Sequence, residues 1–479
     1  MVDDGRTVPP FATRGVLAVA GVVALLHCTA TAFASGYWFD EVYMLAIGRY
    51  HLDWGSADQP PLAPALAAMA DAIAPGSLFA LRLPAVVATA GAVVVAGLIA
   101  RELGCDGSAQ VFTAAAQATG LWVTLAGHWL TPYTVEPVQW MLLVWLLIRW
   151  QRVRDDRLLL VLGAVIGIAA MTKFQVMLLC LMLLAAVAIC GPRDLLRRPM
   201  LWAGAALAVL IAAPTLIWQY LHEWPQLRMT PVVASEAQAL YGGRLGIAVE
   251  LLLFAGLAGL VLGSYGLVRL LRADEMRPYR YLGMTFVLLF VVFVATSGRP
   301  YYLAGLYAPL AAAGALGLQR RREAGRAPRR RLVWPAWLAA TAVAVGVLVT
   351  SVSITRSDTA EDIVRRTADV YHGLPSAQRD RTAIVGESYI VAAFVDGYSK
   401  RYGLPQAYSL NRSYGYFAPP PVDRDVVLYV GADPDALRPY FGDTRRIADI
   451  NDDMRAYLLS GQRQSWDVIW SDARTLTVS

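Results

Sequence analysis

The chain has 479 residues, of which 57% are hydrophobic and 16% charged, and its formal net charge is +6. Several apolar runs reach the ~20 residues that cross a bilayer, which excludes a soluble globular protein and indicates a polytopic membrane protein. Arginines cluster in short loops between these runs, where they act as a topology signal, so no nucleic-acid partner is expected. The four cysteines have no metal-ligand spacing and predict no disulfide framework.

We expect a mainly α membrane domain over residues 1–354, with about 11 transmembrane helices, and a small α/β extracytoplasmic domain over residues 355–479. The expected spans are 14–34, 79–100, 109–127, 135–150, 158–172, 174–190, 200–219, 245–270, 281–297, 301–318 and 333–354. Arginine-rich inner loops place the amino terminus in the cytoplasm and the C-terminal domain outside the cell membrane. The run from Arg320 to Arg331 is interpreted as an inner anchor, with a lipid-headgroup or nucleic-acid patch as the alternative.

The first expected outer loop, residues 35–78, contains two adjacent carboxylates, Asp40 and Glu41, close to the first span. Ionised side chains at that depth are costly and often functional. A carboxylate there could take a proton from an acceptor hydroxyl while a lipid-linked group is transferred. The alternative, that the two acids only mark where a helix leaves the bilayer, is equally compatible with this stretch. Further along the loop, Ala65–Ile73 predicts a short helix on the membrane surface.

Four further polar segments fall on the same expected face: Gly127–Pro137, Ala170–Gln175, Trp218–Arg244 and Ser297–Tyr302. A cavity that opens outward would gather them, although each segment alone could be an interfacial anchor. Lys173 is the only lysine of the membrane domain, and its compact ammonium could neutralise a phosphate. The alternative for Lys173 is snorkelling toward the lipid headgroups. Arg299 is a second phosphate candidate.

Five motifs follow one another along this face: Phe39-Asp40-Glu41 with Asp58-Gln59-Pro60-Pro61, then Thr131–Pro137, Met171–Phe174, Leu216–Pro225 and Gly298–Leu303. Together they resemble the bacterial branch of the protein O-mannosyltransferase and aminoarabinose transferase family, which is glycosyltransferase family 39-like. Members of this family are integral-membrane glycosyltransferases of the GT-C fold that use polyprenyl-phosphate sugars as donors. The resemblance therefore implies a GT-C fold and a lipid-linked sugar donor for this chain.

The resemblance also implies roles for individual residues. Asp40 would be the catalytic base, Glu41 its neighbour and Glu136 a second acid. The donor phosphate would face Lys173, Arg299, Tyr301 and Tyr302, and the substrates would contact Tyr43, Asp58, Gln59, His128, Tyr133 and Trp218. Gln59 departs from the family, whose members commonly carry a histidine there, and His51, Asp53 and Asp58 form no persuasive metal site. No metal or other cofactor is expected, with a divalent ion as the open alternative.

In the tail, residues 355–374 predict an amphipathic helix, and the apolar runs 382–385, 425–430 and 466–470 predict an α/β domain. Two loops, Gly386–Tyr389 and Asn411–Phe417, resemble segments in the tails of related bacterial transferases. Because aromatic faces beside hydrogen-bonding groups suit carbohydrate, we expect Glu387, Tyr389 and Asn411 to contact the acceptor. Ordinary loop packing is the alternative.

These patterns predict an inverting glycosyltransferase of the cell membrane. A polyprenyl-phosphate sugar would be the donor, and an envelope glycan or lipid outside the cytoplasm would be the acceptor, as in cell-wall biogenesis. The main alternative is a transporter or flippase of a lipid-linked glycan, which would predict an internal repeat and matching broken spans. A protein O-glycosyltransferase and a non-catalytic envelope assembly protein are the remaining alternatives.

Overall fold

The computed structural model describes residues 8–326, 330–356 and 359–477, so Arg329 of the arginine-rich run lies outside the described residues. The chain divides into two compact units. Unit 1 comprises residues 1–32, 82–216 and 233–352, and unit 2 comprises residues 33–81, 217–232 and 353–479. The expected first outer loop (residues 35–78, called the outer loop below) and the tail thus belong to one unit, a grouping that the sequence did not predict.

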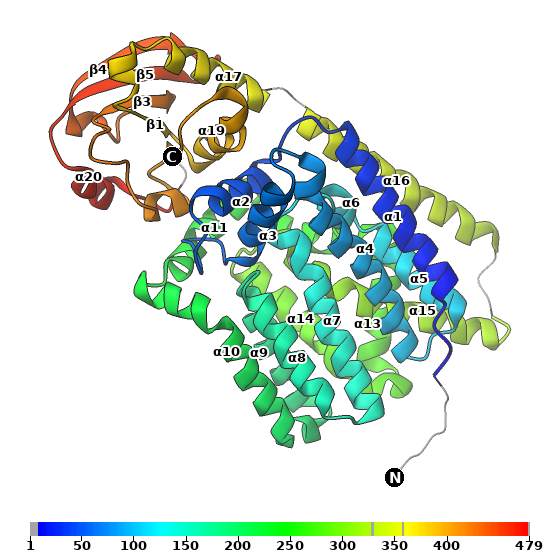
Figure 1. The fold of residues 1–479 in the computed structure, drawn as a ribbon. Coiled ribbons are helices and arrows are strands. Elements are labelled where there is room, and N and C mark those ends of the chain that lie inside the picture. Colours follow the sequence, from blue (N-terminus) through cyan, green and yellow to red (C-terminus); the bar gives the residue numbers. More distant parts are fainter. Residues whose placement is uncertain (1–7, 327–329, 357–358, 478–479) are drawn as a thin grey trace. The chain divides into compact units, whose positions relative to one another are not determined.

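Apolar helices build unit 1 and run side by side in Figure 1. They are α1 (Thr13–Phe33), α4 (Leu78–Glu102), α5 (Gly107–Ala118), α6 (Leu121–Ala126), α7 (Pro132–Val153), α8 (Arg157–Ala170), α9 (Gln175–Cys190), α10 (Pro199–Leu221), α11 (Pro225–Tyr241), α12 (Gly243–Leu253), α13 (Gly256–Arg272), α14 (Arg280–Ala295), α15 (Tyr307–Glu323) and α16 (Arg330–Arg356). Three 3₁₀ segments join them: η1 (Arg193–Arg197), η2 (Asp274–Tyr279) and η3 (Pro300–Leu306). The main core packs apolar side chains of α4, α7, α9, α14 and α15 together.

Six helices in the described part of the chain are long and apolar enough to cross a bilayer, and α12 with α13 would make a seventh span. The expected count of about 11 spans is not confirmed, although helices occupy every expected position. Two expected spans are broken: residues 109–127 are interrupted at Gly120, and residues 245–270 bend by 94° before Gly256, whose φ of +75° suits glycine. Helices α8 and α9 have 14 and 16 residues, fewer than the ~20 that a perpendicular span needs.

Unit 2 contains a mixed five-stranded sheet in the order β2-β1-β3-β5-β4. Its strands are β1 (Thr382–Gly386), β2 (Ala407–Tyr408), β3 (Val426–Gly431), β4 (Phe441–Asp449) and β5 (Arg455–Gln462). Strand β1 pairs in parallel with β2 and β3, whereas β5 is antiparallel to β3 and β4. The α/β class is confirmed, but the apolar run 466–470 forms a helix, α20 (Trp466–Ala473). Its Trp466, Ile469 and Trp470 recur at helical spacing and pack on the sheet.

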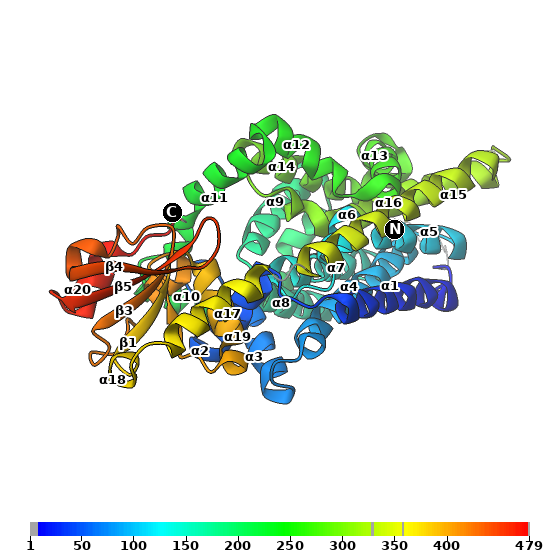
Figure 2. The same ribbon diagram turned by 90° about the horizontal axis from the view of Figure 1, so that it is seen from above.

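The other face of the sheet carries α17 (Thr359–His372) and α19 (Tyr389–Tyr402), as Figure 2 shows. Helix α19 also packs on α2 (Phe39–Tyr50), which is followed by α3 (Leu62–Ile73). The approach of α19 to α2 is close, because a Cβ at Gly397 would lie 2.3 Å from Cγ2 of Val42. The helices expected over residues 65–73 and 355–374 are confirmed as α3 and α17. Helix α19 of the tail therefore packs on α2, whose first turn contains Asp40 and Glu41.

Candidate active site

Lys173 lies in the tight turn between α8 and α9. Its Nζ is 4.9 Å from the ring centre of Tyr301, 4.2 Å from that of Tyr302 and 3.9 Å from Oε2 of Glu136. Only 17% of the lysine side chain is exposed. Attraction between a cation and an aromatic face is stronger where water is excluded. The turn therefore places the lysine of the membrane domain among two aromatic rings and a buried carboxylate.

The tyrosines around Lys173 belong to a larger aromatic cluster. Tyr301 stacks on Trp122 with ring centres 4.4 Å apart, and the Tyr133 ring lies 5.0 Å from Tyr301. Nε1 of Trp122 donates a hydrogen bond to the carbonyl oxygen of Tyr133 at 3.3 Å. The structure thus brings together Tyr133, Tyr301 and Tyr302, as the sequence predicts. Trp122 was missed because it lies in an apolar run, where a tryptophan usually indicates core packing.

The buried side-chain oxygens of α7 that lack a hydrogen-bond partner among the described residues include Oε1 of Glu136 and Oε1 of Gln139. These residues are three positions apart and so share a helix face. Nε2 of Gln139 donates to Oγ1 of Thr172, the neighbour of Lys173, at 2.8 Å. Buried polar atoms are normally satisfied by protein or ordered water. Unsatisfied oxygens beside a half-buried lysine therefore indicate a place for a polar ligand.

The guanidinium of Arg299 has an acidic partner of its own, because its Nη2 donates to Oε2 of Glu236 on α11 at 2.6 Å. Both side chains are largely buried, with 15% and 28% exposed. In the same turn, Oγ of Ser297 accepts a hydrogen bond from Nε2 of Gln238, also on α11, at 2.8 Å. Helix α11 thus anchors the turn that carries the second phosphate candidate. This anchoring was not predicted, because α11 lies in a segment expected to be an outer loop.

His128 is fully buried, and its Nδ1 lies 3.2 Å from Nδ1 of His27 on α1. Its Nε2 has no hydrogen-bond partner within the described part of the chain. The structure therefore pairs this predicted substrate contact with the first span.

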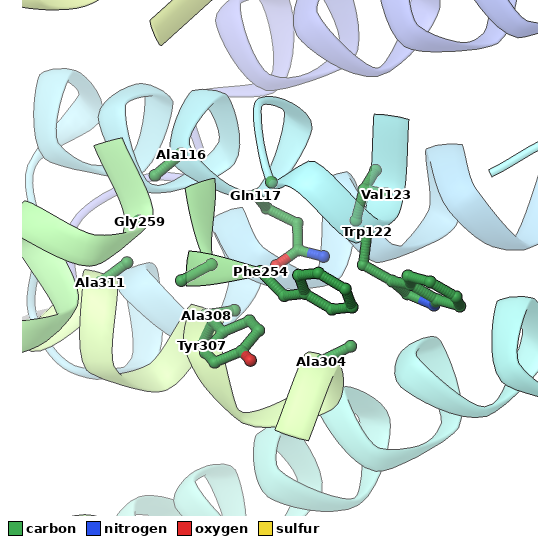
Figure 3. A pocket seen from close by; sticks show the side chains of 12 residues that line it. Ala116, Gln117, Trp122, Val123, Phe254, Gly259, Ala304, Tyr307, Ala308 and Ala311 are labelled. Atoms are coloured by element: carbon green, nitrogen blue, oxygen red, sulfur yellow. The ribbon is translucent and has the colours of Figure 1, made fainter. Parts of the chain in front are cut away.

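Trp122 also stacks on Phe254, with ring centres 5.3 Å apart, and both residues line a small cavity. Figure 3 shows the amide of Gln117 next to the Phe254 ring in this cavity, with Tyr307 on the same side. The remaining walls are mostly alanine and glycine. Trp122 therefore contacts both this cavity and the aromatic residues around Lys173.

In unit 2, Asp40 and Glu41 lie in the first turn of α2 but have different surroundings. Glu41 is fully buried, and its Oε1 accepts the backbone N–H of Trp38 at 2.9 Å. A carboxylate at the third helical position commonly caps the helix in this way. Asp40 is partly exposed. The structure therefore gives Glu41 a capping role, whereas the neighbouring Asp40 is only half-buried.

Replacing Glu41 separates these two roles. We expect Glu41→Ala to lower the free energy of unfolding by about 1–2 kcal/mol, because the N–H of Trp38 would lose its acceptor. Glu41→Gln should be nearly silent in thermal denaturation and in turnover, since glutamine also caps at this position. Loss of turnover in Glu41→Gln at unchanged stability would mean that the charge of Glu41 is needed.

Asp58, in the second motif of the outer loop, is held by the tail. Its Oδ1 accepts hydrogen bonds from the Tyr43 hydroxyl at 2.8 Å and from Oγ of Ser413 at 2.5 Å. The N–H of Ser413 donates to the Tyr43 hydroxyl at 3.1 Å, and its Oγ lies 2.8 Å from Oγ of Ser56. Burial raises the pKa of Tyr43 well above its ordinary value, so this hydroxyl stays a donor. Tyr43 and Asp58 were predicted site residues, whereas Ser56 and Ser413 were missed.

The Leu216–Pro225 motif also contacts the outer loop in unit 2. Nε1 of Trp218 donates to Oδ2 of Asp53 at 2.8 Å, and its ring stacks on His222 with centres 3.8 Å apart. Nε2 of Gln59, the position that departs from the family, donates to Oδ2 of Asp58 at 3.4 Å. Among the described residues, no group of three or more His, Cys, Asp or Glu could hold a metal ion.

The three predicted acceptor contacts of the tail are bound to one another. Oδ1 of Asn411 accepts the N–H of Tyr389 at 2.6 Å, and its Nδ2 donates to the carbonyl oxygen of Glu387 at 3.0 Å. Oε2 of Glu387 accepts the N–H of Ala432 at 3.0 Å, and the Tyr389 ring lies 4.7 Å from Tyr43. These bonds hold the two loops beside the outer-loop residue Tyr43. A role in acceptor binding stays a prediction.

A buried carboxylate joins α19 to the loop that carries Ser413. Asp396 is fully buried and accepts hydrogen bonds from the Tyr414 hydroxyl at 2.6 Å and from the N–H of Ala407 at 2.7 Å. Burial raises its pKa to about 7, while these two bonds and the charge of Arg49 act in the opposite direction. The sequence did not reveal this residue, because an aspartate inside a helix usually faces water.

Asp396 makes the stability of the protein depend on pH. The pKa of Asp396 is about 7 in the folded state and exceeds the ordinary value of 3.8, so the folded protein holds a proton that the unfolded chain releases. The free energy of unfolding that this proton adds is fully present below about pH 4 and is lost as the pH rises through 7. We expect the neutral variant Asp396→Asn to gain stability relative to wild type over this range, by up to about 4 kcal/mol. Burial lowers the pKa of His51 to about 4, which makes stability rise between about pH 4 and 6.5 in both proteins. Denaturation of both proteins at each pH therefore isolates Asp396, and a constant difference would contradict the raised pKa.

Most of the predicted site residues thus fall into two sets, one in each unit, while Arg299 and His128 of unit 1 bind Glu236 and His27 instead. Unit 1 gathers Glu136, Lys173, Tyr133, Tyr301 and Tyr302. Unit 2 contains Asp40, Glu41, Tyr43, Asp58, Gln59, Trp218, Glu387, Tyr389 and Asn411.

Comparisons with known proteins bear on the fold that carries these residues. Residues 58–218 match the family model described as dolichyl-phosphate-mannose-protein mannosyltransferase. No curated protein matches the chain significantly. The crystal structure of ArnT from Cupriavidus metallidurans in the apo state has a TM-score of 0.67 at 14% identity, covering 94% of this chain and 98% of that chain. ArnT from the same organism bound to undecaprenyl phosphate has a TM-score of 0.63 at 15% identity, covering 93% and 97%.

A more distant likeness is the archaeal oligosaccharyltransferase AglB from Archaeoglobus fulgidus, in complex with an inhibitory peptide and a dolichol-phosphate. Its TM-score is 0.51 at 13% identity, covering 94% of this chain and 74% of that chain. These findings confirm the GT-C fold and the family resemblance that the sequence motifs indicate. The matched segment includes Glu136 and Lys173.

Proposed function

From this fold, we propose that the chain is a membrane glycosyltransferase that moves a sugar from a polyprenyl-phosphate donor to an envelope glycan or lipid outside the cytoplasm. The observation that carries the proposal is the position of Lys173, over Tyr301 and Tyr302 and beside Glu136. A lysine ammonium is a compact point charge that suits phosphate, and low exposure strengthens its field. The similar fold of ArnT, a structure bound to undecaprenyl phosphate, supports a lipid-linked donor.

In the proposed reaction, an acceptor hydroxyl attacks the anomeric carbon and the bond from that carbon to the phosphate oxygen breaks, with inversion. Asp40 takes the proton of the attacking hydroxyl. Lys173 neutralises the negative charge that develops on the departing polyprenyl phosphate. Glu136 holds the ammonium in place, and Arg299 is a second cation for the phosphate. The proposed orientation places this chemistry outside the cytoplasm, where nucleotide sugars are absent and a lipid-linked donor is required.

The test is an assay of the purified protein with a panel of polyprenyl-phosphate monosaccharides and total envelope lipids and glycans as acceptors. Release of free polyprenyl phosphate together with labelled acceptor is the expected result. If no donor is consumed while reconstituted protein moves a labelled lipid across vesicles, the transporter alternative replaces this proposal. If labelled protein is the only product, the acceptor is a polypeptide and the acceptor part of the proposal fails.

A further inference from the structure

A second, apolar cavity of unit 1 lies among α7, α8, α9 and α10 and has a volume of about 180 Å³. It is lined by Leu143, Leu147, Leu159, Leu162, Gly163, Ile166, Ala170, Met177, Cys180, Leu183, Leu184, Leu195, Leu201, Trp202, Gly204, Ala205, Ala208, Val209, Ala212 and Leu216. None of these lining residues is charged. The cavity therefore suits a hydrocarbon chain and offers nothing to a polar ligand.

The cavity exists because small residues line the contact between α8 and α10. A Cβ at Gly163 would lie 2.0 Å from the carbonyl oxygen of Gly204, so the two backbones touch there. Around this contact, Ala205 and Ala208 leave space that longer side chains would fill. Close contacts through small residues are typical of membrane helices. The small residues of α8 and α10 therefore account for the space beside this contact.

Arginines lie at one end of this cavity, where α8 begins and η1 joins α9 to α10. Arg157 and Arg197 are each two residues from a lining leucine, Leu159 and Leu195, and both are exposed. The nearby acids have other partners.

Asp194 binds Arg154 at 2.5 Å and lies 3.6 Å from Arg198, which is also 3.6 Å from Asp156. Oδ1 of Asp155 accepts the backbone N–H of Arg157 at 3.0 Å, and no ion pair is described for the guanidinium of Arg157 or of Arg197.

We propose that this cavity binds an acyl chain of an anionic phospholipid whose phosphate is bound by Arg157 and Arg197. Basic clusters beside membrane helices attract anionic headgroups. The apolar cavity would hold the acyl chain of the same lipid against the protein. The competing occupant is the polyprenyl chain of a donor, since the cavity also reaches Ala170, close to Lys173. The charge at the arginine end favours the phospholipid. The proposal is independent of the glycosyltransferase activity.

Native mass spectrometry of the purified protein with phosphatidylglycerol or phosphatidylcholine tests this site. We expect wild type to retain phosphatidylglycerol preferentially and the double variant Arg157→Gln/Arg197→Gln to bind it about 25-fold more weakly, since each arginine near a lipid headgroup contributes about fivefold. The matched control is Arg272→Gln/Arg277→Gln, two exposed arginines away from the cavity lining, which should bind as wild type does.

A second pair of variants tests the cavity itself. Ala205→Phe fills it from an exposed position on α10 and should weaken retention of the lipid, whereas Ala206→Phe, the next residue and not a lining residue, should not. Equal retention of both phospholipids by wild type would overturn the proposal. The proposal would also be overturned if polyprenyl phosphate displaced phosphatidylglycerol from wild type but not from Lys173→Met. The cavity would then bind the chain of the donor. Asp40→Asn should retain the lipid as wild type does, which separates this result from the fate of the proposed function.

Discussion

Lys173→Met is expected to lower the rate of sugar transfer by at least about 100-fold, the size of effect seen when one group that stabilises transition-state charge is removed. Methionine keeps most of the side-chain volume and the contacts with Tyr301 and Tyr302 but removes the charge. Release of polyprenyl phosphate measures the effect. The chain offers a matched control in Lys400, its only other lysine, which is 53% exposed and paired with Asp71 at 2.9 Å. Lys400→Met should keep wild-type turnover, because exposed ion pairs contribute little.

The loss of Lys173 also leaves Glu136 buried without its cation, which destabilises a fold by about 3–5 kcal/mol when the carboxylate stays charged. The double variant Lys173→Met/Glu136→Gln removes that conflict. If the double variant folds well and remains inactive, Lys173 acts on the donor. Recovery of turnover in the double variant would show that the lysine only neutralises Glu136, and the phosphate role would then fall to Arg299.

Asp40→Asn is expected to lower kcat by about 10²–10⁴-fold while the affinity for polyprenyl phosphate stays unchanged, because asparagine keeps the shape of aspartate but cannot accept the proton. Turnover and equilibrium binding of the lipid, measured on the same preparation, separate the two effects. The matched control is Asp53→Asn in the same loop. Its side-chain oxygen can still accept the bond from Trp218, so activity should persist.

Wild-type turnover by Asp40→Asn would remove Asp40 from the role of base and leave Glu136 as the next candidate. A parallel fall in lipid affinity would instead mean that Asp40 shapes the donor site. Because Glu41→Gln is expected to be active, the pair Asp40→Asn and Glu41→Gln tests whether the two adjacent acids differ as their surroundings indicate.

Much of the fold could be predicted because bilayers and sheets impose simple patterns. Long apolar runs located helices at every expected span, and short apolar runs located β1 and β3. The failures have physical causes. The run 466–470 is too short for its periodicity to distinguish a strand from a helix. The breaks at Gly120 and Gly256 depend on packing and backbone conformation, which hydropathy does not record. Strands β4 and β5 are largely polar on their outer faces and therefore left no apolar run.

The sequence by itself determined the class of protein, because membrane insertion depends on the length of apolar runs. It also identified the candidate site residues, because a single lysine in the membrane domain and two adjacent acids can be recognised from residue type alone. Only the tertiary structure decided what surrounds each of them. It placed Lys173 over Tyr301 and Tyr302, which lie more than a hundred residues away in the chain. It also made Glu41 a helix cap and joined Asp58 to Ser413 of the tail. Burial and hydrogen bonding arise from contacts between distant segments, and these contacts exist only after the chain has folded.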